Sequence, residues 1–265
     1  MKLTNSVLSL LAFATVASGA LLSGVAVAMP TSGSQLPYVA QVSAKDLFVQ
    51  GLDRYKQGDY KGAIASFTEV IELQPDVAGG YIFRAESYLK LGNHKKAIED
   101  YNRALAIDPE EPLAYGGRGD AYAELDRHGE AIKDYDRAIE LDPSQASYFI
   151  NRGAARNAIR DFQGAIGDMS QALSLNSESS LAYYNRGIGY LNLNSPKQAL
   201  TDFDAALKLN PSWAAAYRMR GSTRLRLGDR TGTLEDYRKA SALFQQQGRT
   251  QDYQDMQKRL RELSR

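Results

Sequence analysis

Arginine and aspartate recur in this chain at a fixed spacing, and these residue types could bind an anion or a metal ion. Five arginines stand 34 residues apart, and each is followed by an aspartate 16 residues later. If these residues have a chemical role, the repeated arginines and aspartates would form a series of anion-binding or metal-binding sites along the chain. The simpler interpretation is structural, in which each pair joins neighbouring helices and fixes the register of a repeated fold. The pairs are Arg84 and Asp100, Arg118 and Asp134, Arg152 and Asp168, Arg186 and Asp202, and Arg220 and Asp236.

No other residues assemble a catalytic or metal site. The only histidines, His94 and His128, stand 34 residues apart, and we interpret them as exposed turn residues too distant for shared metal coordination. The chain has no cysteine, which excludes thiolate nucleophiles, thiolate metal sites and disulfides. It also lacks a Gly-x-Ser-x-Gly elbow and a phosphate loop ending in Gly-Lys-Ser/Thr. We therefore expect no enzymatic activity, no metal and no cofactor.

The residues that must position these side chains follow the same period. Pro75, Pro109 and Pro143 are spaced by 34 residues, and the same step reaches Ser177 and then Pro211. With proline placed at position 32 of a unit, position 8 is always glycine or alanine, and position 20 is alanine in five of six units. Position 24 is large and mostly aromatic, and position 27 is small or short. The chain is therefore an array of one repeated unit.

Each unit is predicted to be a pair of helices. Positions 1–13 have no internal proline and predict helix A, and a short break follows at positions 14–18. Helix B is expected from position 19 to about position 31, where proline ends it. Small residues at positions 8 and 20 let the two backbones approach closely, while positions 24 and 27 are expected to pack helix B against the next helix A. A single short pair could not bury enough surface, so stability requires stacking.

In these positions the chain resembles the tetratricopeptide-repeat (TPR) family over residues 44–245. The resemblance implies an all-α fold, a right-handed α-α superhelix (TPR solenoid) of antiparallel helix pairs. Arginine replaces the family's usual leucine at position 7 in five repeats, and repeat 6 is degenerate, with Thr233 and Gln245 in place of alanine and proline. The repeats are assigned to residues 44–77, 78–111, 112–145, 146–179, 180–213 and 214–247.

Residues 249–265 are expected to form a capping helix. Tyr253, Met256, Leu260 and Leu263 share one face at helical spacing, and the other face is charged. The open end of a solenoid needs such a solvated cap. A helix lying on a membrane surface is the alternative, but the apolar stripe is narrow.

The N-terminal segment predicts export. Residues 1–28 are apolar after Lys2 and end in Ala26-Val27-Ala28, which is typical of a signal-peptidase site. An uncleaved membrane anchor is the alternative, because the apolar run is about 20 residues long. Residues 29–43 are expected to be a flexible spacer. We expect a periplasmic, thylakoid-lumen or secreted protein, with membrane anchoring as the alternative.

Overall charge argues against a general nucleic-acid-binding role. The chain has 32 lysines and arginines against 31 aspartates and glutamates, and without residues 1–28 the two counts are equal. The local exception is repeat 6, whose arginines could contact an acidic partner or anionic head groups. If a membrane is contacted at all, we expect it to be through these arginines or the N-terminal segment.

The TPR resemblance also implies where a partner would bind. In this family helix A lines a concave groove, mainly with positions 2, 5, 6, 9, 12 and 13. Here the first repeats supply an apolar floor, the third supplies acids, and the fourth and fifth supply amides that could grip an extended backbone. The candidate groove residues are Phe48, Tyr55, Ile82, Glu86, Asp120, Glu124, Asn151, Asn157, Tyr184, Asn185, Asn192, Arg218 and Arg226.

These observations predict a non-catalytic scaffold that binds a protein or peptide partner and supports assembly of an extracytoplasmic or membrane complex. The lysine, asparagine and arginine positions with which co-chaperones of this family clamp a carboxylate are matched only by Asn185, so that clamp is not expected. The alternative function is a self-assembling structural protein, whose oligomer would be the functional form. A monomer whose light scattering is independent of concentration would argue against self-assembly.

Overall fold

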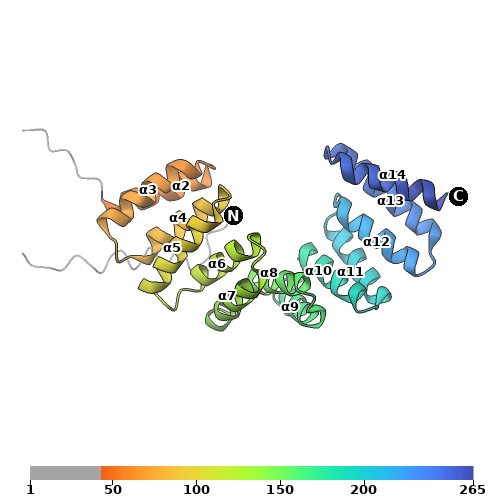
Figure 1. Cartoon of the computed structure of the whole chain (residues 1–265), viewed down its shortest axis with the longest axis horizontal. Helices are drawn as coiled ribbons and strands as arrows, with labels where there is room; N and C mark the ends of the chain where they lie inside the picture. The colour runs from red at the N-terminus through yellow and green to blue at the C-terminus, as the bar shows by residue number, and fades with distance from the viewer. Residues whose placement is uncertain (1–42, 265) are drawn as a thin grey trace, which may run out of the picture. The chain divides into compact units, whose positions relative to one another are not determined.

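The computed structural model describes residues 43–264, and within that range every regular element is an α-helix and no strand is present (Figure 1). The chain divides into two compact units, with the boundary between Pro109 and Glu110. The predicted signal peptide and all of the predicted spacer except Ser43 lie outside the described residues.

Unit 1 contains the first two repeats. The helix A and helix B of each repeat pack against each other, and helix B of repeat 1 also packs against helix A of repeat 2. The four helices are α2 (Ala44–Lys56), α3 (Tyr60–Leu73), α4 (Ala78–Lys90) and α5 (His94–Ile107).

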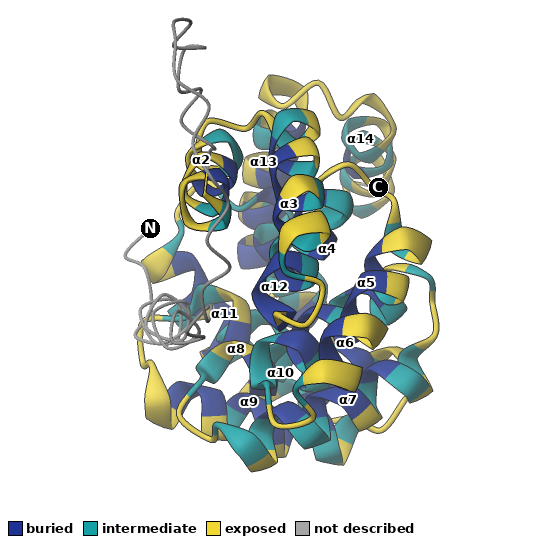
Figure 2. Ribbon diagram, turned by 90° about the vertical axis from the view of Figure 1, so that its left-hand side faces the viewer, coloured by how far each residue is buried: buried dark blue, intermediate teal, exposed yellow. Residues whose placement is uncertain are grey.

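Unit 2 contains the other four repeats and the C-terminal helix. Each helix from α7 onward packs against the helix before it, and α8 also contacts α6 and α10. Buried residues lie where these helices face one another, and exposed residues gather at the turns (Figure 2). The helices are α6 (Pro112–Glu124), α7 (His128–Leu141), α8 (Ala146–Ala158), α9 (Phe162–Leu175), α10 (Ser180–Asn192), α11 (Pro196–Leu209), α12 (Ala214–Arg226), α13 (Arg230–Gln246) and α14 (Thr250–Leu263).

The turn between helix A and helix B is shorter than the sequence predicted. Helix B begins at position 17 of each repeat, two residues before the predicted start at position 19. In four repeats this start is capped at position 16, where Asp59, Asn93, Asp161 and Asp229 accept a hydrogen bond from the third residue of the helix. Position 15 has a left-handed backbone in all six repeats, with φ between 55° and 82°, as in Arg160 at 68°. Glycine suits this conformation and fills position 15 in three of them.

Helix A and helix B approach closely because position 8 faces the ring or long side chain at position 24 of the same repeat. A Cβ atom built on Gly119 would lie 2.7 Å from the Tyr135 ring, and one on Gly51 would lie 2.6 Å from the Phe67 ring. Phe67 also stacks on Phe83 of the next helix A, with ring centroids 5.8 Å apart. Position 24 therefore packs within its own repeat as well as against the next one, which is broader than the sequence predicted.

Two substitutions at Gly119 should separate close packing from helix propensity. Gly119→Val is expected to lower the free energy of unfolding by about 1–3 kcal/mol, because the larger side chain overlaps the Tyr135 ring. Gly119→Ala should change it by less than about 1 kcal/mol, because the gain in helix propensity offsets a small ring shift. Repeat 2 already carries the buried pair Ala85 and Tyr101 at these positions. Urea denaturation followed by circular dichroism measures the free energy of unfolding of both Gly119 variants.

Gly167→Val is the matched control. Outside its own stretch of helix backbone and its two chain neighbours, no atom lies within 4 Å of a Cβ on Gly167. Gly167 is exposed on α9, so this variant should be at least as stable as the wild type. If it were destabilised as much as Gly119→Val, close packing at position 8 would not be the cause.

The C-terminal helix α14 packs through the face that the sequence identified. Met256 is fully buried and clusters with Phe244 of α13, while Tyr253, Leu260 and Leu263 pack around them. The apolar face of α14 is thus occupied within unit 2. In repeat 6, where Gln245 replaces the proline, α13 runs on to Gln246.

Candidate protein-binding surface

The five arginine–aspartate pairs all form within their own repeats. In repeat 2, the Nε and Nη2 atoms of Arg84 donate to the two carboxylate oxygens of Asp100 at 2.8 Å and 2.7 Å. The same two-point contact recurs at Arg118, Arg152, Arg186 and Arg220. This hydrogen bond raises the pKa of Arg84, so the guanidinium stays charged. The structural interpretation of the repeated arginines and aspartates is therefore confirmed.

Arg84, Arg152, Arg186 and Arg220 also reach the preceding repeat. Arg84 Nη1 donates to Thr68 Oγ1 at 3.1 Å, and Arg186 Nη1 donates to Ser170 Oγ at 3.2 Å. Arg152 forms an ion pair with Asp136 at 2.6 Å, and Arg220 forms one with Asp204 at 2.7 Å. Because each guanidinium joins position 23 of its own helix B to position 25 of the previous helix B, it fixes the register between repeats.

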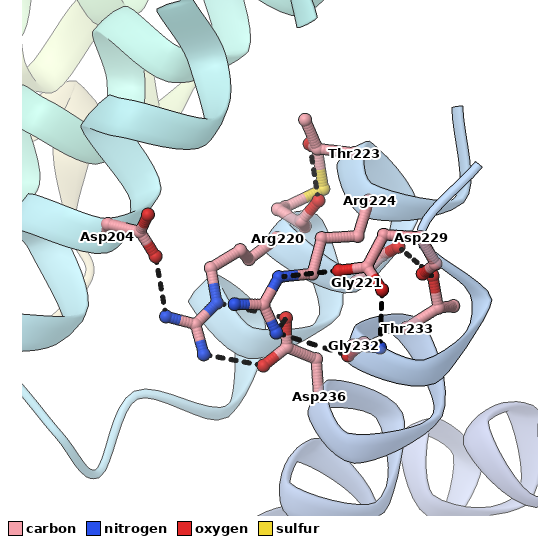
Figure 3. A network of polar contacts seen from close by, with 10 residues as sticks. Asp204, Arg220, Gly221, Thr223, Arg224, Asp229, Gly232, Thr233 and Asp236 are labelled. Carbon is pink, nitrogen blue, oxygen red and sulfur yellow. Dashed lines mark hydrogen bonds and ion pairs between the residues drawn. The ribbon is translucent and has the colours of Figure 1, made fainter. Parts of the chain in front are cut away.

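A second arginine strengthens this network in repeat 6 (Figure 3). Arg224 Nη1 lies 3.2 Å from Asp236, so this buried carboxylate contacts two guanidinium groups. Arg224 also donates to the carbonyl oxygen of Gly232 and lies 3.7 Å from Asp229. A Cβ atom on Gly232 would lie 2.9 Å from the Arg224 side chain and 2.2 Å from the Asp229 carboxylate, so glycine leaves room for both.

In unit 1 two of the predicted partner-binding residues, Phe48 and Tyr55, lie in an aromatic cluster with Phe83 on α2 and α4. The Phe48 ring meets the Phe83 ring edge to face at 5.3 Å, and both are partly exposed. Tyr55 is also partly exposed, and its hydroxyl lies 3.4 Å from Glu86. Ile82 is different, because only 2% of it is exposed and a partner cannot reach it.

Two of the predicted acids have a structural partner. The buried tyrosine at position 24 donates its hydroxyl hydrogen to the acid at position 9 of the same repeat, at 2.8 Å in repeat 2 and 2.7 Å in repeat 3. Where position 24 is phenylalanine or methionine, position 9 is apolar. The pairs of positions 9 and 24 are Leu52 and Phe67, Glu86 and Tyr101, Asp120 and Tyr135, Ala154 and Met169, Ile188 and Phe203, and Ser222 and Tyr237.

The Tyr135 hydroxyl should make stability depend on alkaline pH. Burial, and then the nearby Asp120 carboxylate, raise the pKa of Tyr135 above its usual value of 10.0. An unfolded tyrosine loses its proton near pH 10, so the unfolded state gains relative stability as the pH rises past that value. Tyr135→Phe is expected to cost about 1 kcal/mol at neutral pH and to make the alkaline decline shallower. Urea denaturation between neutral pH and pH 11 measures the unfolding free energy of both proteins. If the hydroxyl does not contribute, this free energy would fall with pH equally steeply in Tyr135→Phe and in the wild type.

In unit 2 the predicted amides join successive A helices. Asn151 Nδ2 on α8 donates to Asp120 on α6 at 2.8 Å. Asn157 Nδ2 on α8 donates to the carbonyl oxygen of Asn185 on α10 at 3.0 Å. Asn192 bonds within its own helix, to Ile188. The side chain of Asn185 is partly exposed and shows no hydrogen bond within the described chain, and Glu124 on α6 is exposed.

The aromatic and basic residues of α10 and α12 lie near two residues that the sequence pattern missed. The Tyr184 ring lies 4.4 Å from the Trp213 ring, and Arg218 forms an ion pair with Asp252, which also contacts Arg249. Trp213 precedes helix A and Arg249 precedes α14, so neither is at a family groove position. The sequence signals were a lone tryptophan and a basic residue at a helix start. Arg226 is exposed and donates to the carbonyl oxygen of Leu191.

The two histidines are partly buried, and they do not lie in the turn but open helix B of their repeats, at the starts of α5 and α7. Across residues 43–264, no three histidine, aspartate or glutamate side chains are grouped closely enough to hold a metal ion. Nor does any helix in that range have the length and apolar character needed to cross a bilayer.

Sequence profiles of the tetratricopeptide repeat match residues 48–112, 84–146 and 180–212. The chain belongs to the tetratricopeptide-repeat family. Its all-α fold of stacked helix pairs is the TPR fold, as predicted. No match to a curated protein sequence was found.

Solved TPR structures share this fold. YrrB, described as a TPR protein with an unusual peptide-binding site, is 25% identical, with a TM-score of 0.58 over 67% of this chain and 91% of YrrB. The pilus biogenesis factor PilW is 18% identical, with a TM-score of 0.71 over 80% of this chain and 97% of PilW. MamA is 22% identical, with a TM-score of 0.58 over 62% of this chain and 96% of MamA.

Proposed function

We propose that this TPR protein is a non-catalytic scaffold that binds a peptide or protein partner on the exposed faces of its A helices. One observation carries the proposal: the charged residues that recur in every repeat from the second onward are bonded to one another within the fold. They therefore hold the repeats in register and are not available for acid–base or nucleophilic chemistry. The part-exposed aromatic and amide side chains of helix A remain for recognition.

Each unit offers a different chemistry. In unit 1, Phe48, Phe83 and the exposed Val49 provide an apolar surface suited to aliphatic or aromatic anchors. In unit 2, Asn185 and Tyr184 can hydrogen-bond an extended backbone without desolvating a charge. The peptide-binding site described for YrrB supports the peptide as a partner class.

We further propose that the protein works outside the cytoplasm, in assembly of an extracytoplasmic or membrane complex. Support comes from the apolar segment of residues 1–28 and its Ala26-Val27-Ala28 ending. Mass spectrometry of the protein purified from its native host would test this, because signal-peptide cleavage predicts a chain that begins at Met29.

Affinity capture from the native compartment tests the scaffold proposal. The variant Asn185→Arg places bulk and charge on the helix A surface of α10, while the backbone oxygen that accepts from Asn157 stays in place. A specific partner, identified by mass spectrometry and reconstituted from purified proteins, should be lost from this variant.

The matched control is Gln198→Arg, which makes the same change at an exposed site on helix B of the same repeat. It should retain the partner. Equal retention by both variants would contradict binding at this surface of α10, and the absence of any reproducible partner would contradict the scaffold itself.

A further inference from the structure

We propose that the C-terminal end of unit 2 contains a binding site for a carboxylate side chain of an acidic peptide, formed by Arg218, Arg249 and the hydroxyl of Tyr184. The inference rests on the proposed scaffold function and names the chemistry of the partner. It concerns α10, α12 and the start of α14, all within unit 2.

Two guanidinium groups at this place share one carboxylate. Asp252 accepts from Arg218 Nη1 at 3.3 Å through Oδ1 and contacts Arg249 Nη2 at 2.7 Å through Oδ2. The Arg218 side chain is 33% exposed and that of Arg249 is 48% exposed, so both can contact a ligand. The three side chains carry a net positive charge, and each guanidinium has further N–H donors, since arginine has five. A second carboxylate would complete the pairing.

Aromatic rings hold these groups in place. The Arg218 and Arg249 guanidiniums lie 5.9 Å and 4.7 Å from the centre of the buried Phe244 ring, within range of cation–π attraction. Because arginine stacked on a ring loses less freedom when it binds, the site is partly preorganised.

Tyr184 supplies a neutral donor beside the charges. Its ring packs 4.4 Å from the Trp213 ring, and its hydroxyl shows no hydrogen bond to another described residue. Burial raises the pKa of Tyr184 while Arg218 and Arg249 oppose the rise, so the hydroxyl keeps its proton at neutral pH. The Tyr184 hydroxyl could donate a hydrogen bond to an incoming carboxylate oxygen.

The charge along unit 2 favours an acidic partner at this end. Residues 214–265 contain 12 basic and 6 acidic residues, whereas residues 110–213 contain 10 basic and 15 acidic residues. Acidic segments are repelled by residues 110–213 and attracted to residues 214–265, which orients their approach.

A peptide carboxylate fits the site better than a membrane or a nucleic acid. Asp252 contacts both arginines and would repel a dense row of phosphates more strongly than it repels a single carboxylate. Tyr184 is partly buried, so a single protruding side chain reaches it more readily than a head group held in the plane of a bilayer.

Fluorescence anisotropy with the full-length chain tests the site. The probe is a fluorescein-labelled nine-residue peptide rich in aspartate and glutamate, and its counterpart carries asparagine and glutamine at the same positions. The acidic peptide should bind at least about tenfold more tightly, and Arg218→Gln with Arg249→Gln should remove about tenfold of its affinity. Tyr184→Phe should weaken binding by about threefold with no change of charge.

Arg238→Gln is the control, because it removes one exposed positive charge from α13, where no ion pair with Arg238 is present among the described residues. It should bind like the wild type, and thermal melts of every variant establish that each is folded. Equal affinity for both peptides, equal loss in the control, or stronger binding to phosphatidylglycerol vesicles or to a single-stranded oligonucleotide would overturn the site. None of these results would contradict the scaffold function, because that function is tested separately by affinity capture, in which Asn185→Arg should lose the partner.

Discussion

Replacing Asp236 by alanine is expected to lower the free energy of unfolding by about 3–5 kcal/mol. The Asp236 side chain is only 3% exposed, and its carboxylate contacts Arg220 at 2.6 Å and Arg224 at 3.2 Å (Figure 3). The substitution leaves two poorly exposed guanidinium groups without their shared counter-ion. It therefore costs far more than the pair itself contributes, because water cannot fully solvate either charge.

Asp204→Ala provides the matched comparison, because Asp204 also pairs with Arg220, at 2.7 Å. The Asp204 side chain is 51% exposed, and exposed pairs contribute about 0–1 kcal/mol, so a small effect is expected. Urea denaturation measures both variants, and hydrogen exchange in α12 and α13 localises the loss. Similar small losses in the two variants would show that the pair in repeat 6 is well solvated and does not hold the repeat together.

The 34-residue repeat predicted most of the fold. The register set by small residues at positions 8 and 20 and proline at position 32 predicted where each helix A ends. It also predicted that each arginine at position 7 pairs with the aspartate at position 23. The start of helix B was predicted too late, because Asp59 and Asn93 were assigned to the turn although they cap the helix. Capping depends on one side-chain oxygen, which a pattern of small and large residues does not register.

The candidate surface was less predictable than the helices. Family positions placed Glu86 and Asp120 in the groove, but their bonds to buried tyrosines depend on which residue stands at position 24. Comparing positions 9 and 24 across the six repeats would have shown this correlation. Trp213 and Arg249 lie outside helix A, so a search confined to helix A positions could not find them. The bond from Asn157 to a backbone carbonyl depends on the geometry between helices and has no sequence signal.

Met256→Ala is expected to cost about 2–5 kcal/mol, because it leaves a cavity at the centre of the contact between α13 and α14. Met256 is fully buried, and Phe244, which is also fully buried, depends on the same contact. Much of the loss should appear as local detachment of α14, since an end helix contacts only one neighbouring repeat. The amides of Thr250–Leu263 should then exchange with solvent faster than those of α12, and trypsin should cleave first after Arg249, which is exposed beside Gly248 in the turn.

Lys258→Ala changes the same helix on its exposed face and should leave exchange and cleavage as in the wild type. Because α14 also supplies Asp252 and follows Arg249, its detachment in the Met256 variant should weaken binding of the acidic peptide without any change in the binding residues themselves. Retained protection of α14 in that variant would mean that Tyr253, Leu260 and Leu263 hold the helix without Met256, and the C-terminal end of the stack would then be closed by a broader contact than one buried side chain.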